Sequence, residues 1–294
     1  MSCFVAQVDL SIAPKLKEGL IAQGFSLTTP PYTVFQGKKS GVSVTLYASG
    51  KLTVQGSAGQ EFIRYYLEPE ILETFSFGYE AALADPTPRI GVDESGKGDF
   101  FGPLCIAGVF GGEGQIQKLL EIGVKDSKQI GDKAVHKLAE KIKRDFTHHV
   151  VQINPLKYNE LYEKFGNLNL LLGWGHATVI EQLIEKTGCE RVIIDQFAAE
   201  HVVERALKRK GTHALLTQRT KAESDPVVAA ASILARAAFL DGLAFLGTKL
   251  ELTLPKGAGA QVIEAGKRAC QMHGKEVLPR IAKLHFKTTD LILS

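Results

Sequence analysis

The sequence predicts a small α+β domain over residues 1–75 and an α/β domain over residues 89–294. The first prediction rests on an amphipathic helical stretch that is followed by strict apolar–polar alternation. The second rests on short apolar stretches that alternate with helical patterns from Ile90 onward, as in a sheet flanked by helices. Residues 76–88 carry two prolines and no hydrophobic period, so we interpret them as a linker.

The small domain contains a predicted helix and a predicted β-hairpin. The helix ends near Gly24, and its apolar face carries Ile12, Leu16, Leu20 and Ile21. Residues 41–56 alternate around a turn at Ser49–Gly50, with an apolar face that would be buried. The opposite, polar face carries Ser43, Thr45, Tyr47, Thr53 and Gln55. A second helix is expected over residues 59–67, because Pro69 limits its extent.

The larger domain has the pattern of a buried sheet with crossover helices. Short apolar stretches predict strands at 89–94, 105–112, 148–153 and 190–195. Helical patterns cover 133–145, the latter part of 169–186, and 226–240. The last of these has Ser224 or Asp225 as its N-cap and Pro226 in its first turn.

Composition describes a globular, thiol-containing protein. Of the 294 residues, 45% are hydrophobic and 23% are charged, which is ordinary for a soluble domain. We expect a cytoplasmic protein with no membrane partner, because no apolar run reaches the roughly 18 residues of a membrane helix and no secretory signal is visible. The cysteines form no CxxC pair, which disfavours structural zinc; they are Cys3, Cys105, Cys189 and Cys270.

The net charge of +3 says little, but its distribution is uneven. Residues 205–222 and 267–287 are strongly basic, whereas residues 67–88 are acidic. Basic clusters of this kind favour a polyanionic partner. Solvated helix faces would explain any one of them equally well.

The segment GVDESGKGD, from Gly91 to Asp99, nearly matches a Walker A phosphate loop. Gly98 stands where that loop needs a Ser or Thr hydroxyl, and Asp93 and Glu94 would repel phosphate groups. A carboxylate pair at the end of a buried strand suits a divalent cation, because hard cations prefer oxygen ligands. We therefore interpret this segment as a metal site, with a solvated turn as the alternative.

Two further acids extend the metal-site hypothesis. Asp195 ends an apolar strand, and functional groups in α/β sheets gather at the carboxyl ends of strands. Glu223 lies just before the N-terminus of an Ala-rich helix, where a carboxylate is stabilised by the helix dipole. A structural role for Asp195 and a capping role for Glu223 stay open, although Asp225 suits capping better.

These segments resemble the motifs of type-2 ribonucleases H. The resemblance covers residues 89 to about 288, and four motifs occur in the family's order. They read GVDESGKGDFFGPL from Gly91, VKDSK from Val124, VIIDQF from Val192 and KAESDPVVAAASILAR from Lys221.

Further features resemble the ribonuclease HIII branch of that family. The recognition loop reads Gly96-Lys97-Gly98 where type-2 enzymes usually carry Gly-Arg-Gly, and the fourth acid is Glu223 instead of Asp. Residues 1–75 resemble the branch's N-terminal domain, which is similar to half of a TATA-binding-protein fold. KLHF at 283–286 resembles its C-terminal end.

The resemblance implies a ribonuclease-H-like domain with a mixed central sheet flanked by helices. It implies endonucleolytic hydrolysis of the RNA strand of RNA–DNA hybrids, with two Mg²⁺ or Mn²⁺ ions and with 5′-phosphate and 3′-hydroxyl products. The metal-binding carboxylates it implies are Asp93, Glu94, Asp195 and Glu223, with Asp225 as the fallback for the fourth. We expect a monomer.

Substrate contacts are expected from three places. Gly96 and Gly98 would let backbone groups approach a 2′-hydroxyl. The other candidates are Lys97, Ser127 and Lys128 in the large domain and Tyr47 and Lys51 in the small one. We interpret Trp174 as a packing residue. A related metal-dependent DNA nuclease and a non-catalytic nucleic-acid binding module are the alternative functions.

Overall fold

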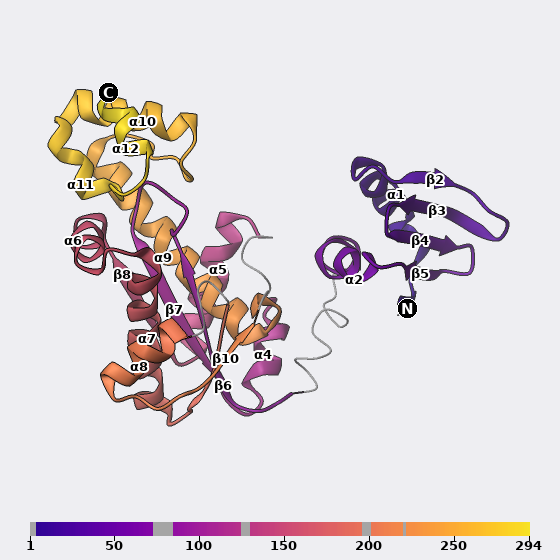
Figure 1. The fold of residues 1–294 in the computed structure, drawn as a ribbon. Coiled ribbons are helices and arrows are strands. Elements are labelled where there is room, and N and C mark those ends of the chain that lie inside the picture. Colours follow the sequence, from indigo (N-terminus) through magenta and orange to yellow (C-terminus); the bar gives the residue numbers. More distant parts are fainter. Residues whose placement is uncertain (1–3, 73–84, 125–129, 196–200, 220–221) are drawn as a thin grey trace. The chain divides into compact units, whose positions relative to one another are not determined.

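The computed structural model describes residues 4–72, 85–124, 130–195, 201–219 and 222–294 (Figure 1). The chain divides into two compact units, residues 1–84 and 85–294, which we describe separately. Most of the predicted linker at 76–88 lies outside the described residues, as does the motif at 125–128.

The first unit is a five-stranded antiparallel sheet with helices on one face. Its strands stand in the order β1-β5-β4-β3-β2. They are β1 (Phe4–Gln7), β2 (Ser26–Thr28), β3 (Thr33–Lys39), β4 (Val42–Tyr47) and β5 (Lys51–Gln55). The helical elements are η1 (Leu10–Ile12), α1 (Ala13–Ala22), α2 (Gly59–Phe62) and its continuation η2 (Ile63–Leu72). Leu16 and Leu20 of α1 and Leu67 of η2 are buried in one core with the apolar sheet face.

The predicted β-hairpin is confirmed as β4 and β5. Val44 pairs with Val54 and Leu46 with Leu52, so the apolar side chains meet in the core. The opposite face is less exposed than its polarity suggested: Thr45 and Thr53 are only 6% and 7% exposed. They lie in central strands with neighbours on both sides, and Gln36 Nε2 donates to Thr45 Oγ1 at 3.0 Å.

The second helix is longer than predicted. It continues past Pro69 as a π-type turn to Leu72, although proline was expected to limit it. Leu67 and Ile71 are both buried in the core of this unit, so packing of the helix outweighs the cost of the proline.

The second unit contains a mixed five-stranded sheet in the order β10-β9-β6-β7-β8. Its strands are β6 (Arg89–Ser95), β7 (Leu104–Gly111), β8 (His148–Ile153), β9 (Arg191–Asp195) and β10 (Leu215–Arg219). The strands β10, β9 and β6 are parallel, and β7 is antiparallel to both β6 and β8. The predicted α/β class with a mixed sheet is thereby confirmed.

Helices cover both faces of this sheet (Figure 1). One face packs against α4 (Gln115–Glu121), α5 (Asp132–Asp145) and α9 (Pro226–Leu250). The other packs against α6 (Pro155–Phe165), α7 (Leu168–Thr187) and α8 (His201–Lys210). A third cluster joins Phe100 and Phe101 to α10 (Ala260–His273), α11 (Leu278–Ile281) and α12 (Thr288–Leu293).

The long helix α9 lies unusually close to strand β6. A Cβ on Gly91 would stand 2.4 Å from the backbone nitrogen of Val228, so only glycine allows this approach. The helix is apolar enough to span a membrane by composition, but 78% of its most apolar window is buried, as in the core helix of a globular protein. Its close packing brings Ser232 and Arg236 to the end of β6.

Candidate active site

Three of the predicted carboxylates converge at one edge of the mixed sheet. Val92 pairs with Ile194 in the parallel register of β6 and β9, so Asp93 and Asp195 follow in neighbouring positions. Together with Glu94 they line a cavity of about 580 Å³. The cavity is also lined by Gly96, Lys97, Gly98, Asp99, Ser232, Arg236 and Lys256.

Asp93 is the most electrostatically perturbed of these acids. Burial raises the pKa of Asp93 well above its ordinary value, and the nearby charges of Glu94 and Asp195 raise it further. A hydrogen bond with the Ser232 side chain acts in the opposite direction. Carboxylates gathered in this way repel one another, and a cation between them would relieve the repulsion.

Glu94 is held by two basic side chains. Its Oε2 lies 3.1 Å from His176 Nε2 and its Oε1 lies 3.6 Å from Lys97 Nζ. Burial would raise the pKa of Glu94, but the hydrogen bond from His176 and the charges of His176 and Lys97 together lower it below its ordinary value. Glu94 is thus fixed as a carboxylate that faces the cavity.

His176 is a site residue that sequence reasoning missed. It is fully buried on α7, 82 positions along the chain from Glu94. The signal in the sequence was a histidine within a mostly apolar stretch of a predicted helix. That signal does not reveal which acid the imidazole contacts.

Asp195 and Glu223 are linked through the backbone. Ala222 N donates to Asp195 Oδ1 at 3.2 Å, which docks the short turn η4 (Ala222–Ser224) on the end of β9. Glu223 is partly exposed in this turn and is not among the residues that line the cavity. The structure therefore brings Asp93, Glu94 and Asp195 together, and leaves Glu223 beside them.

Asp225 is occupied by other interactions. Its Oδ1 accepts a hydrogen bond from Val227 N at 2.9 Å and caps α9. Its Oδ2 forms an ion pair with Arg89 Nε at 2.8 Å, and both side chains are buried. Because each oxygen already has a partner, Asp225 is a poor candidate for a metal ligand.

The chemistry of the donors fits a hard divalent cation. Carboxylate oxygens are the ligands that Mg²⁺ and Mn²⁺ prefer, and burial, reinforced by the neighbouring acids, raises the pKa of Asp93. Within the described ranges, no three His, Cys, Asp or Glu side chains already stand close enough to hold an ion.

The predicted recognition loop follows β6. Gly96 has a φ of +88°, and a Cβ there would stand 2.3 Å from the carbonyl oxygen of Pro103, so this position requires glycine. Gly98 is exposed, and a Cβ on it would meet no atom within 4 Å. The fold therefore does not require a glycine at position 98, which leaves room for a ligand to approach the backbone.

A buried lysine fixes this loop from the far end of the sequence. Lys283 Nζ donates to the carbonyl oxygens of Asp99 at 2.8 Å, Phe101 at 3.3 Å and Gly102 at 2.7 Å. Gly102 N also donates to the carbonyl oxygen of Ile281 at 3.0 Å. Sequence reasoning used Lys283 for the family resemblance and counted it in the basic cluster at 267–287, but it is fully buried and its role as an anchor was missed.

The remaining predicted contacts lie elsewhere. Tyr47 and Lys51 belong to the first unit, on the face of its sheet that points away from the core. Ser127 and Lys128 lie outside the described residues. Trp174 is partly buried and packs near Phe165, with ring centroids 6.3 Å apart, in keeping with a packing role.

A mixed sheet with acids at the ends of two adjacent parallel strands, in a cavity that also holds basic side chains, defines a nuclease domain of the ribonuclease H type. The family model for ribonuclease HII matches residues 90–289. A domain of unknown function, DUF3378, matches residues 3–76. The chain belongs to the ribonuclease HIII branch of this family.

Similar proteins span nearly the whole chain. Ribonuclease HIII of Protochlamydia amoebophila is 56% identical over 99% of this chain and 96% of that protein. Ribonuclease HIII of Chlamydia felis is 49% identical over 98% and 97%. A solved structure of Bst-RNase HIII in complex with Mn²⁺ has a TM-score of 0.68 at 30% identity, covering 99% of this chain and 98% of that one.

Proposed function

We propose that the chain hydrolyses the RNA strand of RNA–DNA hybrids endonucleolytically and leaves 5′-phosphate and 3′-hydroxyl ends. Membership of the ribonuclease HIII branch supports this reaction. The observation that carries the proposal is the convergence of Asp93, Glu94 and Asp195 at the ends of two neighbouring strands. A degenerate binding module would not need to keep three acids together in one cavity.

Asp93, Glu94 and Asp195 would hold two divalent cations, with Glu223 as the fourth carboxylate after a movement of its turn. When bound, such ions activate a water and stabilise the charge that develops on the phosphate. The protein's own residues prepare the site before any ion binds. His176 and Lys97 orient Glu94, and the backbone of Ala222 orients Asp195.

The loop Gly96-Lys97-Gly98 is proposed to distinguish the RNA strand from DNA. Its open position at Gly98 lets backbone groups approach the minor groove, where the 2′-hydroxyl distinguishes RNA from DNA. Lys97 lies 38% exposed beside Glu94 and can reach a phosphate without leaving the cavity rim. Ser127 and Lys128 are further candidates for the same strand.

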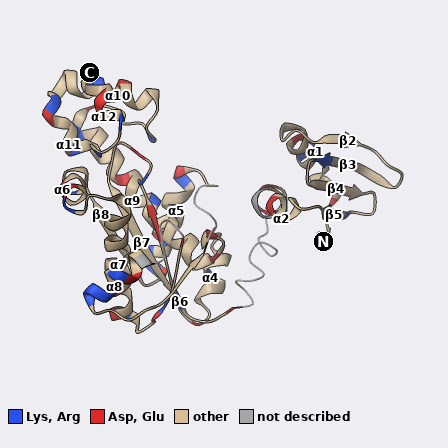
Figure 2. Cartoon of the chain, in the orientation of Figure 1, with Lys and Arg blue, Asp and Glu red and all other residues tan. Residues whose placement is uncertain are grey.

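The first unit is proposed to bind the hybrid through the polar face of its sheet. Cross-strand pairs place Lys38 beside Ser43 and Thr33 beside Tyr47, with Lys51 on the same face. No acid stands among these sheet residues, so the face suits sugar and phosphate groups in a shallow minor groove. Basic residues along α8 and in the C-terminal helices add positive charge to the second unit (Figure 2).

The proposed boundaries are a substrate-binding domain at 1–75, a linker at 76–88 and a catalytic domain at 89–294. A monomeric, cytoplasmic enzyme is part of the same proposal.

Cleavage of matched duplexes tests the function. RNA–DNA, DNA–DNA and RNA–RNA duplexes of one sequence are incubated with Mg²⁺, with Mn²⁺ and with a chelator. We expect cleavage of the RNA strand of the hybrid alone, and none with the chelator. Equal cleavage of the DNA duplex would favour the alternative DNA nuclease, and metal-independent binding without any cleavage would favour a binding module.

The fourth ligand is tested in the same assay with two variants. Glu223→Gln should lose nearly all activity and keep its stability. Asp225→Asn should lose stability but, below its melting temperature, keep most of its turnover. The reverse pattern would move the fourth ligand to Asp225.

A further inference from the structure

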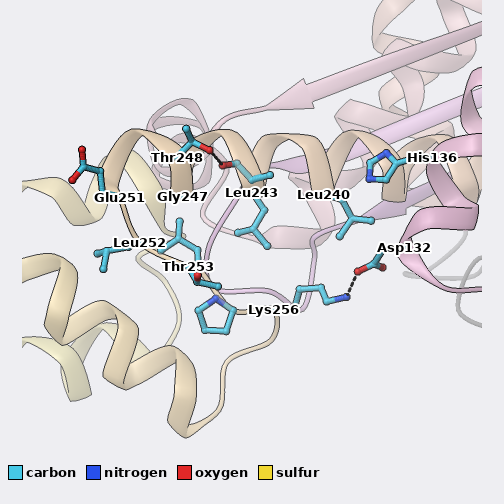
Figure 3. A pocket seen from close by; sticks show the side chains of 13 residues that line it. Asp132, His136, Leu240, Leu243, Gly247, Thr248, Glu251, Leu252, Thr253 and Lys256 are labelled. Carbon is cyan, nitrogen blue, oxygen red and sulfur yellow. Dashed lines mark hydrogen bonds and ion pairs between the residues drawn. The ribbon is translucent and has the colours of Figure 1, made fainter.

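Asp132 forms ion pairs with two basic side chains, which come from different parts of the second unit. Its Oδ1 lies 2.7 Å from Arg236 Nη2 and its Oδ2 lies 3.0 Å from Lys256 Nζ. Asp132 is the first residue of α5, Arg236 lies in the middle of α9, and Lys256 follows α9. Figure 3 shows Lys256 reaching across to Asp132, while Leu240 and Leu243 extend from α9 toward the segment that carries Lys256.

Lys256 stands where two hollows meet, and Arg236 lies in one of them. Arg236 and Lys256 both line the cavity that holds Asp93 and Asp195. Lys256 and Leu240 also line a neighbouring groove of about 790 Å³ that runs beside α9 as far as Glu251 (Figure 3). A strand that leaves the catalytic cavity along this groove would pass Lys256, after Arg236 in the cavity itself.

The backbone around Lys256 is fixed to the recognition loop. Gly257 N donates to Asp99 Oδ1 at 2.6 Å, and Phe100 N donates to the carbonyl oxygen of Gly257 at 2.9 Å. Lys256 is thus held on its main-chain side by the loop and on its side-chain side by Asp132. Lys256 therefore has support on both sides, although its side chain is half exposed.

Stability alone does not account for the pairing of Lys256 with Asp132. The side chains of Asp132 and Lys256 are 45% and 50% exposed, and exposed ion pairs contribute only about 0.2–1 kcal/mol. Arg236 and Lys256 share the single carboxylate of Asp132 and stand together at the rim of the cavity. A guanidinium beside an ammonium is a common way to bind a phosphate.

We propose that Arg236 and Lys256 form a phosphate clamp, positioned by Asp132, for the RNA-strand phosphate next to the scissile one. This inference rests on the proposed hydrolysis of RNA–DNA hybrids and deepens it. Arg236 and Lys256 would touch the substrate, whereas Asp132 acts only through them. The clamp directs the strand out of the catalytic cavity and into the groove beside α9.

The first test measures binding of a labelled hybrid by full-length protein in an Asp195→Asn background, which prevents cleavage. Arg236→Gln and Lys256→Gln should each weaken binding by roughly 3- to 10-fold and reduce the slope of log K against log salt by about one. Lys143→Gln, at an exposed position on α5, is the matched control and should match its parent. Unchanged slopes in both clamp variants would overturn the proposal.

The second test separates positioning from charge. Asp132→Asn removes a negative charge, so charge alone predicts tighter binding and undiminished turnover. Positioning predicts a kcat lowered about tenfold although the site is more positive. Arg236→Lys should keep the salt slope yet lose turnover, because the planar fork is gone. An Asp132→Asn enzyme that binds more tightly and turns over at the parental rate would overturn the role of Asp132.

Failure of the clamp is distinguishable from failure of the function. If the unsubstituted protein does not cleave the hybrid, the proposed function is wrong. If it cleaves and the clamp variants match it in affinity, salt slope and kcat, only the clamp is wrong. Mn²⁺ titration by calorimetry should give the same Mn²⁺ affinity for every clamp variant, because no substituted residue is a proposed metal ligand. Weakened Mn²⁺ binding would instead place these residues in the metal site.

Discussion

Replacement of Asp225 by Asn should destabilise the second unit far more than loss of a helix cap. Asn is itself a good N-cap and can still accept the hydrogen bond from Val227 N. The other atom of its side chain becomes an amide nitrogen, which would face the Nε–H of Arg89. Arg89 would then be a buried cation without its counter-ion.

The structure gives the size of this effect. The side chains of Arg89 and Asp225 are 1% and 9% exposed, so water cannot replace the lost partner. Arg89 Nη1 also donates to the carbonyl oxygens of Asp85 and Thr87, both at 2.9 Å, which prevents the guanidinium from moving to solvent. Breaking a buried pair of this kind costs about 3–5 kcal/mol. A lost cap costs about 1 kcal/mol.

Urea unfolding followed by circular dichroism measures the loss of unfolding free energy in the variant. In thermal unfolding, its melting temperature should fall by roughly 6–20 °C. Asp241→Asn, on the same helix but 62% exposed, is the control and should change stability by less than about 0.5 kcal/mol. Adding Arg89→Met to Asp225→Asn should recover part of the loss, because the unpaired charge is removed. A loss below about 1 kcal/mol for Asp225→Asn would refute the reasoning.

Three further outcomes are expected. Asp195→Asn should abolish cleavage with little change in melting temperature, and more than about a tenth of parental activity, a loss under 1.4 kcal/mol of barrier, would contradict the site. Deletion of residues 1–84 should raise KM far more than it lowers kcat, and it should flatten the salt dependence of hybrid binding. If the truncated enzyme binds the hybrid with the same salt dependence as the full chain, the first unit has another role. Burial lowers the pKa of Lys283 to about 8 from an ordinary 10.5. Between these two pH values the unfolded chain holds a proton on Lys283 that the folded chain has released. The free energy of unfolding therefore rises with pH in this range. The unfolding free energy of the parent relative to Lys283→Met should therefore increase from pH 8 to pH 10, by at most about 1.4 kcal/mol per pH unit, and a constant difference in urea titrations would refute this.

The elements that sequence predicted well are those specified by local patterns. The hairpin at 41–56 follows from alternation and a glycine turn, and β6 and β9 follow from apolar runs that end in acids. The start of α9 follows from its capping residue and Pro226. Each of these signals lies within a few residues of the feature that it predicts.

The features that sequence could not predict depend on contacts between distant segments. The burial of Thr45 requires β3 and β5 on either side of it. The contact of His176 with Glu94 spans 82 positions, and that of Asp132 with Arg236 spans 104. A single sequence gives the chemical types of these residues but not their pairing, so the support around the carboxylates had to be found in the structure.

The anchoring of the recognition loop by Lys283 has a consequence for the order of events during synthesis. Lys283 follows Asp99 by 184 positions, so the loop is translated long before its anchor. At about 5–20 residues per second, the delay is roughly 10–40 s. In the later part of that interval, once β9 has been translated, the carboxylates of β6 and β9 can already stand side by side in the sheet, but the loop beside them lacks its ammonium support. A ribosome-bound chain that still lacks residue 283 would therefore hold the acids of a nuclease without the loop geometry that presents RNA to them, and nascent chains would be poor at cutting hybrids.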